Sequence, residues 1–369
     1  IAVFISTPSQ PSSMAMAASA RDLGCVDVAR GIQRTLRFVQ HLPKFGWEPL
    51  VLSADPRAYE RTSDDLLADV PEGTVVRRAF ALDTARHLSI AGRYVGAMAR
   101  PDRWVSWKYA AVRDGMRMIR EFKPQAIWST YPIATAHLIG AELQRKSGLP
   151  WIADFRDPMA QDGYPTDPLT WQCYKAIEAH TLHTASFSTF TTPGAARTYL
   201  SRYPLDSDRV RVLENGYDEE TFAAAASSNV ERKSLNPGAI TLLHSGIVYP
   251  AERDPTQLFE ALGRLKAAGT MQAGALVIRF RAPVHDDLLQ SLATRYAVTE
   301  FIDCQPPVPY RDALAEMLAA DGLLVMQAAN CNEQIPAKIY EYLRAIPMFT
   351  GMHRFLPTLM KLQGAKVAE

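Results

Sequence analysis

The sequence lacks the patterns that identify several common protein classes. None of its apolar runs approaches the ~20 residues of a membrane-spanning helix. The four cysteines, Cys25, Cys173, Cys304 and Cys331, form no CxxC pair, which excludes a zinc-ribbon spacing and favours a reducing compartment. No GxGxxG motif follows an expected strand and no GxxxxGKS/T motif occurs, so a nicotinamide dehydrogenase or a P-loop enzyme is disfavoured.

An excess of charge of either sign is also missing. Forty Lys and Arg against 39 Asp and Glu leave a formal net charge of +1, so the composition gives no electrostatic sign of a nucleic-acid partner. Hydrophobic residues make up 47% and charged residues 21%, which are ordinary values for a globular protein. The length of 369 residues exceeds the roughly 250–300 residues at which one core stops growing, so two domains are expected.

Apolar runs of strand length alternate with helical patterns along most of the chain. Strands are expected over residues 1–6, 49–53, 75–77, 126–130, 151–155, 187–191, 210–213, 240–244, 276–280, 299–302 and 322–326. The alternation predicts an α/β fold of two Rossmann-like, doubly wound parallel-sheet domains. The small and polar stretch 223–238 is the expected linker between a first domain over 1–222 and a second over 239–369.

The segment 332–343 carries two carboxylates with seven residues between them. Glu333 is expected in the loop after a buried strand, and Glu341 in the second turn of a helix that Pro336 starts. Ligands bind at the carboxyl edge of open α/β sheets, and a carboxylate there suits the two hydroxyls of a ribose. The alternative interpretation is an exposed helix acid at Glu341 and a charge favourable to the helix dipole at Glu333.

Five segments resemble parts of one protein family and occur in the same order. They are GIQRTLRFVQHLPKFGWEPLVLSA, LPWIADFRDP, VLENGYDEETF, LLHSGIVYPAERDPTQLFEAL and NEQIPAKIYEYLRA, which begin at residues 31, 149, 212, 242 and 332. Together they resemble the retaining family 4 glycosyltransferases, and in particular a bacterial subgroup that assembles polysaccharides and cell-surface glycans. The resemblance implies the GT-B fold, in which two Rossmann-like domains face a central cleft.

The resemblance also implies roles for residues of the donor-binding domain. Glu333 would lie beside the donor sugar, and Glu341 would hold the nucleotide ribose. Arg253 and Lys338 would be the cations on the donor pyrophosphate, where they offset the charge that grows on the leaving group. Gly246 would let the backbone approach the diphosphate.

Further roles follow for residues on either side of the expected cleft. Gly31 would approach the donor from the first domain, and His244 ends the first strand of the donor domain. Asp154, Arg156 and Asp157 end an expected strand and would contact the acceptor or the donor sugar. The alternatives are turn chemistry at Asp157 and a structural ion pair between Arg156 and Asp157.

Four positions depart from the family pattern. Ile247 stands where many members have arginine, Arg156 stands where many have histidine, and a usual glycine pair is reduced to Gly31. The familiar Gly-x-Pro after the last helix is replaced by Ala345-Ile346-Pro347. Only a remnant of the family's last βα unit follows, so the second domain is expected to be incomplete.

The function that the resemblance implies is retaining transfer of a sugar from a nucleoside diphosphate donor to a glycan or lipid-linked acceptor. The departing phosphate would serve as the base, so no cofactor is expected. A metal site is not expected either, because Asp206 and Asp208 fit a DxD motif only within an expected surface turn. Two other interpretations stay open: a nucleotide-sugar epimerase of the same fold, and a non-catalytic scaffold at the membrane surface.

Residues 77–120 are strongly basic, with nine Arg and one Lys against three Asp. Two triplets recur there at helical spacing on different sides: Arg113, Arg117 and Arg120, and Val112, Met116 and Ile119. This pattern is typical of a helix lying on anionic lipid, so a cytoplasmic protein peripheral to the inner face of the plasma membrane is one expectation. The other is a solvated helix whose apolar side packs on the sheet. No RNA-binding signature accompanies the segment, so no nucleic acid is expected as a partner.

Overall fold

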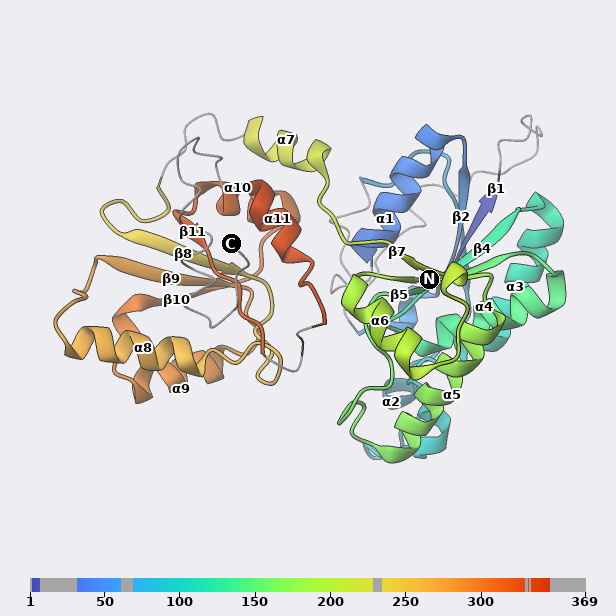
Figure 1. Ribbon diagram of the computed structural model, residues 1–369, viewed down its shortest axis with the longest axis horizontal. Helices are drawn as coiled ribbons and strands as arrows, with labels where there is room; N and C mark the ends of the chain where they lie inside the picture. The colour runs from blue at the N-terminus through green and yellow to red at the C-terminus, as the bar shows by residue number, and fades with distance from the viewer. Residues whose placement is uncertain are drawn as a thin grey trace. The chain divides into compact units, whose positions relative to one another are not determined.

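The structure, a computed structural model, describes residues 2–6, 32–60, 69–227, 234–328, 331 and 333–345. The chain divides into two compact units, Ile1–Asn215 with Glu333–Ile335, and Gly216–Asn332 with Pro336–Glu369 (Figure 1). The boundary after Asn215 lies earlier than the expected end of the first domain at residue 222. The reason is the helix α7 (Glu219–Ser227), whose Phe222 belongs to the core of the second unit.

The first unit is built on a seven-stranded sheet in the order β3-β2-β1-β4-β5-β6-β7. The strands are β1 (Ala2–Ser6), β2 (Glu48–Ala54), β3 (Val75–Ala79), β4 (Ala126–Thr130), β5 (Trp151–Phe155), β6 (Phe187–Phe190) and β7 (Val210–Val212). Six of them run in one direction, as predicted, whereas β1 is antiparallel to both of its neighbours. The prediction of a wholly parallel sheet is therefore wrong for β1, because a short apolar strand buries the same side chains in either direction.

Helices pack on both sides of this sheet, with α1 on one side and α3 and α4 on the other (Figure 1). They are α1 (Ile32–His41), α2 (Thr84–His87), α3 (Trp107–Phe122), α4 (Ala134–Ser147), α5 (Pro168–Thr184) and α6 (Pro193–Arg202). Side chains of Asp83, Asp167 and Thr192 cap the first turns of α2, α5 and α6. Trp151 and Phe155 of β5 are fully buried in the core between these layers.

The basic helix α3 does not present its apolar side to solvent. Val112, Met116 and Ile119 are partly buried and pack against the core of the first unit. The structure thus favours a solvated helix over one lying on lipid at this position. None of the helices in the described ranges combines the length and the hydropathy that a bilayer span requires.

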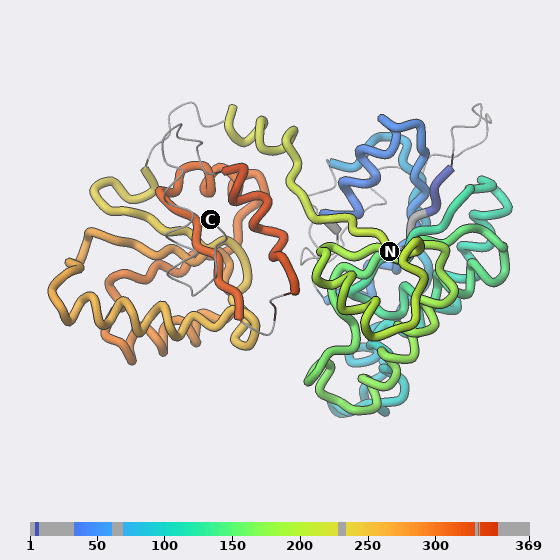
Figure 2. Tube along the Cα trace, viewed as in Figure 1, coloured from blue at the N-terminus to red at the C-terminus, as the bar shows by residue number. Residues whose placement is uncertain are grey.

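The second unit contains a four-stranded parallel sheet in the order β10-β9-β8-β11. Its strands are β8 (Ile240–Ser245), β9 (Leu276–Arg281), β10 (Ile302–Gln305) and β11 (Gly322–Leu323). Besides α7, its helices are α8 (Thr256–Ala267), α9 (Asp286–Arg295), α10 (Tyr310–Ala319) and α11 (Lys338–Ala345). Helices α8 and α9 cover one face of the sheet and α10 and α11 the other, as the chain trace in Figure 2 shows.

Two expected elements of the second unit are displaced. The strand expected over 299–302 is instead β10, because Thr299–Phe301 forms a 3₁₀ turn that puts Phe301 into the core. Helix α11 begins at Lys338 rather than at Pro336. This later start makes Lys338 the first residue of the helix, next to the carboxyl end of β8.

Candidate functional site

The carboxyl end of β8 carries the first group of site residues. His244 is fully buried, and its Nδ1 lies 2.9 Å from the carbonyl oxygen of Leu324. Because a carbonyl oxygen only accepts hydrogen bonds, Nδ1 carries the proton, and Nε2 accepts from the Lys338 ammonium at 3.0 Å. Burial, together with the positive charge of Lys338, lowers the pKa of His244 to about 3, so its imidazole is neutral at pH 7.

This contact fixes Lys338 beside the first turn after β8. Its Nζ also donates a hydrogen bond to the carbonyl oxygen of Ser245 at 2.8 Å. Gly246 follows with φ +105°, a conformation that side chains rarely adopt, and a Cβ there would lie 3.6 Å from the Lys338 Nζ. The turn therefore combines an ammonium group with a backbone that a ligand can approach closely.

Arg253 supplies a second cation near the same strand end. Its Nη1 donates to the carbonyl oxygen of Ile247 at 2.8 Å, and its Cζ lies 5.2 Å from the centroid of the Tyr249 ring. Like the charge of Lys338, the charge of Arg253 helps to lower the pKa of His244. A planar guanidinium fork next to an ammonium is an arrangement that suits two phosphate groups.

Helix α11 places Glu341 one turn after Lys338. The Glu341 Oε1 accepts a hydrogen bond from the Tyr310 hydroxyl at 2.6 Å, and the side chain is partly exposed. The neighbouring Tyr342 is buried, and its hydroxyl oxygen accepts from the backbone N–H of Ser245 at 2.8 Å. This bond ties α11 to the end of β8, so the helix holds Glu341 at a defined place relative to the two cations.

The first unit has a different polar centre, at the carboxyl end of β5. Asp154 is fully buried, and Arg34 donates to both of its carboxylate oxygens at 3.1 Å. The hydroxyls of Thr130 and Thr189 donate to the same carboxylate at 2.9 and 2.7 Å. Both carboxylate oxygens are thus occupied from inside the protein, and Asp154 positions Arg34 rather than facing a sugar.

Arg34 in turn connects three segments of the first unit. It is only 8% exposed, and its remaining N–H groups donate to the carbonyl oxygens of Leu213 and Glu214 and to the Asn215 side chain. Helix α1, strand β5 and the segment after β7 are therefore held together by one guanidinium. Sequence reasoning missed Arg34, although the segment GIQRTL that contains it carries part of the resemblance.

Arg156 and Asp157 follow β5 and lie nearer to the surface. Burial lowers the pKa of Arg156, while the charges of Asp157 and Asp154 oppose that shift. Arg156 is partly buried and Asp157 is exposed, and the backbone carbonyl of Arg156 accepts from the Thr191 hydroxyl at 2.9 Å. Of the three predicted residues at this strand end, Asp157 is the one that is exposed, whereas the Nε and Nη1 atoms of Arg156 are buried.

Glu333 is grouped with the first unit, not with Lys338 and Glu341. Its backbone carbonyl accepts from the Thr192 hydroxyl at 2.6 Å, and its carboxylate lies 3.8 Å from Arg197. A side chain at Gly194 would overlap this carboxylate, so the first turn of α6 is open to it. The carboxylate therefore lies at the amino end of a helix, where the dipole favours negative charge.

A buried histidine also lies within the first unit. His137 is fully buried, its Nδ1 lies 2.9 Å from the Ser129 hydroxyl, and its ring centroid lies 4.8 Å from that of Phe155. The Trp151 indole donates to the same hydroxyl at 2.9 Å. Burial lowers the pKa of His137 to about 3. This histidine is therefore a neutral part of the core of the first unit.

Two other predictions concern a metal and Gly31. Within the described ranges, no three or more His, Cys, Asp or Glu side chains gather in a way that could hold a metal ion. Asp206 caps a 3₁₀ turn over Ser207–Arg209, as expected for a surface turn. Gly31 lies outside the described residues.

Comparison with known families gives one match. Residues 31–216, half of the chain, match a family model described as a glycosyl transferase 4-like domain. The match spans both the Arg34–Asp154 centre and the Arg156–Asp157 pair of the first unit. A search of curated protein sequences finds no match.

Solved structures of similar fold cover most of the chain. The Anabaena protein HepE in complex with UDP-glucose is 11% identical, with a TM-score of 0.51 over 80% of this chain and 78% of its own. Sucrose-phosphate synthase from Thermosynechococcus elongatus is 14% identical (TM-score 0.53, 85% and 74%). A trehalose 6-phosphate synthase from Burkholderia multivorans is 13% identical (TM-score 0.53, 80% and 81%). The predicted GT-B fold is thereby confirmed.

Proposed function

Because this chain belongs to the family of glycosyl transferase 4-like proteins, we propose that it transfers a sugar, with retention of configuration, from a nucleoside diphosphate donor to a glycan or lipid-linked acceptor. The observation that carries the proposal is the pair formed by the neutral His244 and the Lys338 ammonium at the end of β8. A buried imidazole that fixes a cation beside an open glycine turn is suited to a diphosphate. The HepE structure holds UDP-glucose, which supports this donor class.

The proposed donor contacts all lie in the second unit except one. Lys338 and Arg253 take the diphosphate, Gly246 lets it approach the backbone, and Glu341 binds the ribose hydroxyls in place of, or together with, its contact to Tyr310. Glu333 is proposed to lie beside the donor sugar. The acceptor is assigned to Arg156 and Asp157 of the first unit, positioned by the buried Arg34–Asp154 centre.

The proposed reaction needs no base from the protein. The bond between the anomeric carbon and the β-phosphate oxygen breaks, and negative charge grows on that oxygen, where Lys338 and Arg253 stabilise it. The acceptor hydroxyl attacks the same face of the sugar and passes its proton to the departing phosphate. These cations are proposed to replace a metal ion, so EDTA should leave the rate unchanged.

The proposed location is the cytoplasm. Cys173 and Cys304 are free thiols, which suits a reducing compartment. Burial raises the pKa of Cys304 to about 11, which keeps this thiol protonated and unreactive at neutral pH.

A binding screen followed by turnover tests the proposal. The UDP, GDP, TDP and CDP forms are compared by thermal shift; the true donor nucleotide at 100 times its dissociation constant should add about 2.7 kcal/mol of stability. Arg253→Ala should weaken this binding, whereas Arg264→Ala, which removes an exposed arginine of α8, should not. Absence of binding by every nucleotide would overturn the proposal.

Two further readouts separate the alternatives. Exchange of solvent deuterium into the donor sugar without an acceptor would indicate an epimerase. Nucleotide binding without turnover on any acceptor would indicate a scaffold. Transfer with the anomeric configuration preserved is the expected result.

A further inference from the structure

The segment 90–98 of the first unit exposes an unusual number of large apolar side chains. Ile90 is 84% exposed and Val95 is 65% exposed, and Tyr94 and Met98 are also exposed. Side chains of this kind cost free energy in water, and an exposed group of them on a monomer marks an interaction surface. Neither the donor contacts nor the acceptor residues proposed above involve this segment.

The tip of the segment has a defined backbone. Ile90 and Arg93 face each other through two hydrogen bonds, with the N–H of each donating to the carbonyl of the other at 2.8 and 3.0 Å. Ala91 and Gly92 between them have φ of 50° and 74°. Two residues with positive φ form the tight turn that closes a hairpin. Ile90 is the first residue of this four-residue turn, 90–93, which we call the knuckle.

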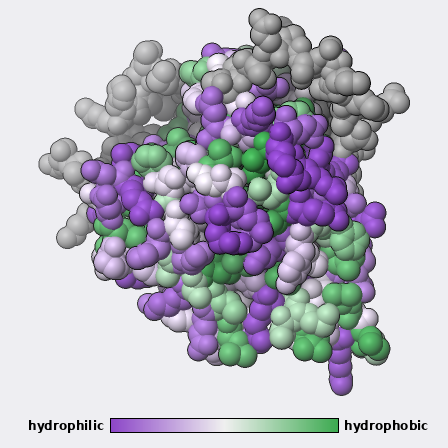
Figure 3. Space-filling view, turned by 90° about the vertical axis from the view of Figure 1, so that its right-hand side faces the viewer, coloured by the Kyte–Doolittle hydropathy of each residue, from purple (hydrophilic) through white to green (hydrophobic). Residues whose placement is uncertain are grey.

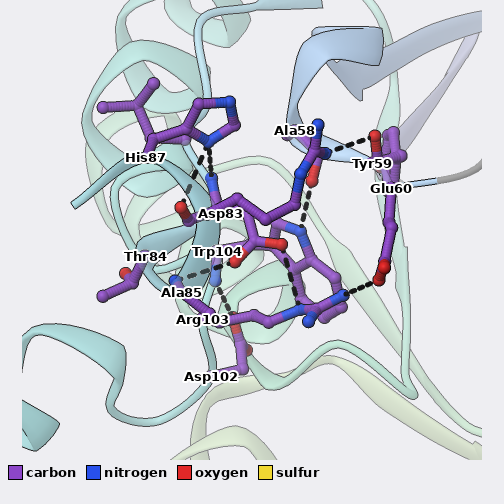
Figure 4. Close-up of polar contacts among 12 residues, drawn as sticks. Ala58, Tyr59, Glu60, Asp83, Thr84, Ala85, His87, Asp102, Arg103 and Trp104 are labelled. Carbon is purple, nitrogen blue, oxygen red and sulfur yellow. Dashed lines mark hydrogen bonds and ion pairs between the residues drawn. The ribbon is translucent and has the colours of Figure 1, made fainter. Parts of the chain in front are cut away.

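The base of the segment is tied to the unit by the contacts drawn in Figure 4. The buried Asp83 accepts from the N–H of Ala85 at 2.9 Å and lies 3.3 Å from the Arg103 guanidinium. The Thr84 N–H donates to the Arg103 carbonyl at 2.8 Å. Residues 84 and 103 are therefore joined directly, so the chain between them forms a loop whose two ends are held together. Within this loop, the Thr84 hydroxyl donates to the Met98 carbonyl at 3.0 Å.

A second loop is joined to this segment by an ion pair. Arg100 lies 3.5 Å from Asp167, the capping residue of α5, and Tyr164 and Leu169, close to Asp167 in the sequence, are 50% and 51% exposed. Helices α2 and α5 are both seen towards the lower end of the first unit in Figure 1. In Figure 3, hydrophobic residues alternate with hydrophilic ones along the lower edge of this unit.

Charge identifies the occupant of this surface. Residues 84–101 contain three arginines and no acidic residue; Arg100 is paired with Asp167, so Arg86 and Arg93 carry the positive charge of this segment. A second copy of the chain would bring these like charges together, whereas an anionic bilayer would attract them. Tyrosines with a ring and a hydroxyl suit the level of the lipid headgroups.

We propose that residues 90–98, with Tyr164 and Leu169, form a docking surface that inserts into the interface of an anionic lipid bilayer. The membrane contact expected from residues 77–120 is thereby assigned to the knuckle of this segment and not to helix α3. The inference does not depend on glycosyl transfer. It places the protein at the membrane whichever acceptor it uses.

Vesicle co-sedimentation tests the proposal with the purified chain. Binding is compared between vesicles of neutral phosphatidylcholine and vesicles that also contain about 30% of the anionic lipid phosphatidylglycerol. The double variant Ile90→Ser/Val95→Ser should bind the anionic vesicles at least tenfold more weakly. Phe45→Ser, which removes another exposed apolar side chain of the same unit, is the matched control and should bind like the original protein.

Three readouts keep the test decisive. Arg93→Gln should weaken binding to anionic vesicles and leave binding to neutral ones unchanged. The melting temperature and the nucleotide-induced thermal shift of the double variant should match those of the original, so a failure of donor binding is recognised separately. Equal vesicle binding by the double variant and the control, or concentration-dependent dimers that the double variant abolishes, would overturn the proposal.

Discussion

Each unit of this protein places a polar pair at the carboxyl end of a central strand, but the two pairs are built differently. In the first unit, Asp154 and Arg34 are opposite charges; Asp154 is fully buried and the Arg34 side chain is 8% exposed. In the second, Lys338 is bound by the neutral His244 and by a backbone carbonyl, neither of which carries a charge. The first pair joins two opposite charges inside the fold, and the second joins a cation to a neutral ring beside the Gly246 turn.

Burial and charge together separate a positioning centre, which holds segments of the fold in place, from a binding centre, which contacts a substrate. A saturated carboxylate such as Asp154 holds segments together and has no oxygen left for a substrate. An ammonium oriented by a neutral imidazole keeps the charge that a diphosphate needs. The first centre should therefore matter most for stability, and the second for turnover.

Removal of Asp154 is expected to have the largest effect. Asp154→Ala leaves the Arg34 guanidinium buried without its carboxylate, so the free energy of unfolding of the first unit should fall by about 3–5 kcal/mol. Chemical denaturation with a probe in the first unit measures this loss. The double variant Asp154→Ala/Arg34→Met should recover part of it, because no buried charge then stands alone. A loss in the double variant as large as in the single one would contradict the assignment.

Substitution of Lys338 should have the opposite profile. Lys338→Gln removes the cation at the phosphate site, so kcat is expected to fall about 10²-fold, equivalent to ~2.7 kcal/mol of transition-state stabilisation. The unfolding free energy should change by less than about 1 kcal/mol, since the side chain is only partly buried. Steady-state kinetics against Lys266→Gln, a lysine of α8 that also donates to a backbone carbonyl, provides the comparison. Equal kinetic losses in the two variants would remove the special role of Lys338.

The two buried histidines give the smallest effect per pH unit and the one that both units share. Burial lowers the pKa of His137 and of His244 to about 3, below the 6.5 of an exposed histidine. The unfolded chain therefore binds protons that the folded units do not, and stability falls as the pH decreases from about 6.5 towards 3. Each histidine should contribute a slope of up to about 1.4 kcal/mol per pH unit.

Unfolding measured between pH 7 and pH 4 checks this prediction. His137→Phe should flatten the pH dependence of the first unit and His244→Phe that of the second. Stability that depends on pH to the same degree in both variants and in the original would show that other groups carry the effect.

The sequence predicted the fold where strands are short and almost continuously apolar. Strands β4 and β5 begin and end where expected, because an apolar run between polar turns leaves little choice. The direction of β1 was not predictable, since pairing direction depends on partners far along the chain. Phe301 shows a similar limit: its burial is achieved by a 3₁₀ turn, which the apolar pattern alone does not distinguish from a strand.

The site was predictable as a set of residue types but not as a set of contacts. The sequence pointed to Lys338, Gly246 and His244, and the structure places the Lys338 ammonium within hydrogen-bond distance of His244 and beside the Gly246 turn. It could not reveal that Asp154 is saturated, because its partners Arg34 and Thr189 come from elements 120 and 35 residues away. Long-range side-chain contacts of this kind carry no local signal.

The position of α7 has a consequence for how this protein can be recombined. The helix follows the boundary at residue 215 and packs within the second unit. Its Phe222 shares a cluster with Leu243, Leu314 and Tyr342. Its Glu219 pairs with Arg344 of α11. A chimera meant to exchange donor specificity with another GT-B protein should therefore be joined at residues 215 and 216. A junction placed after α7 would give the incoming domain a foreign helix over the element that carries Lys338 and Glu341. An exchange of the donor-binding half as one unit therefore has to include α7.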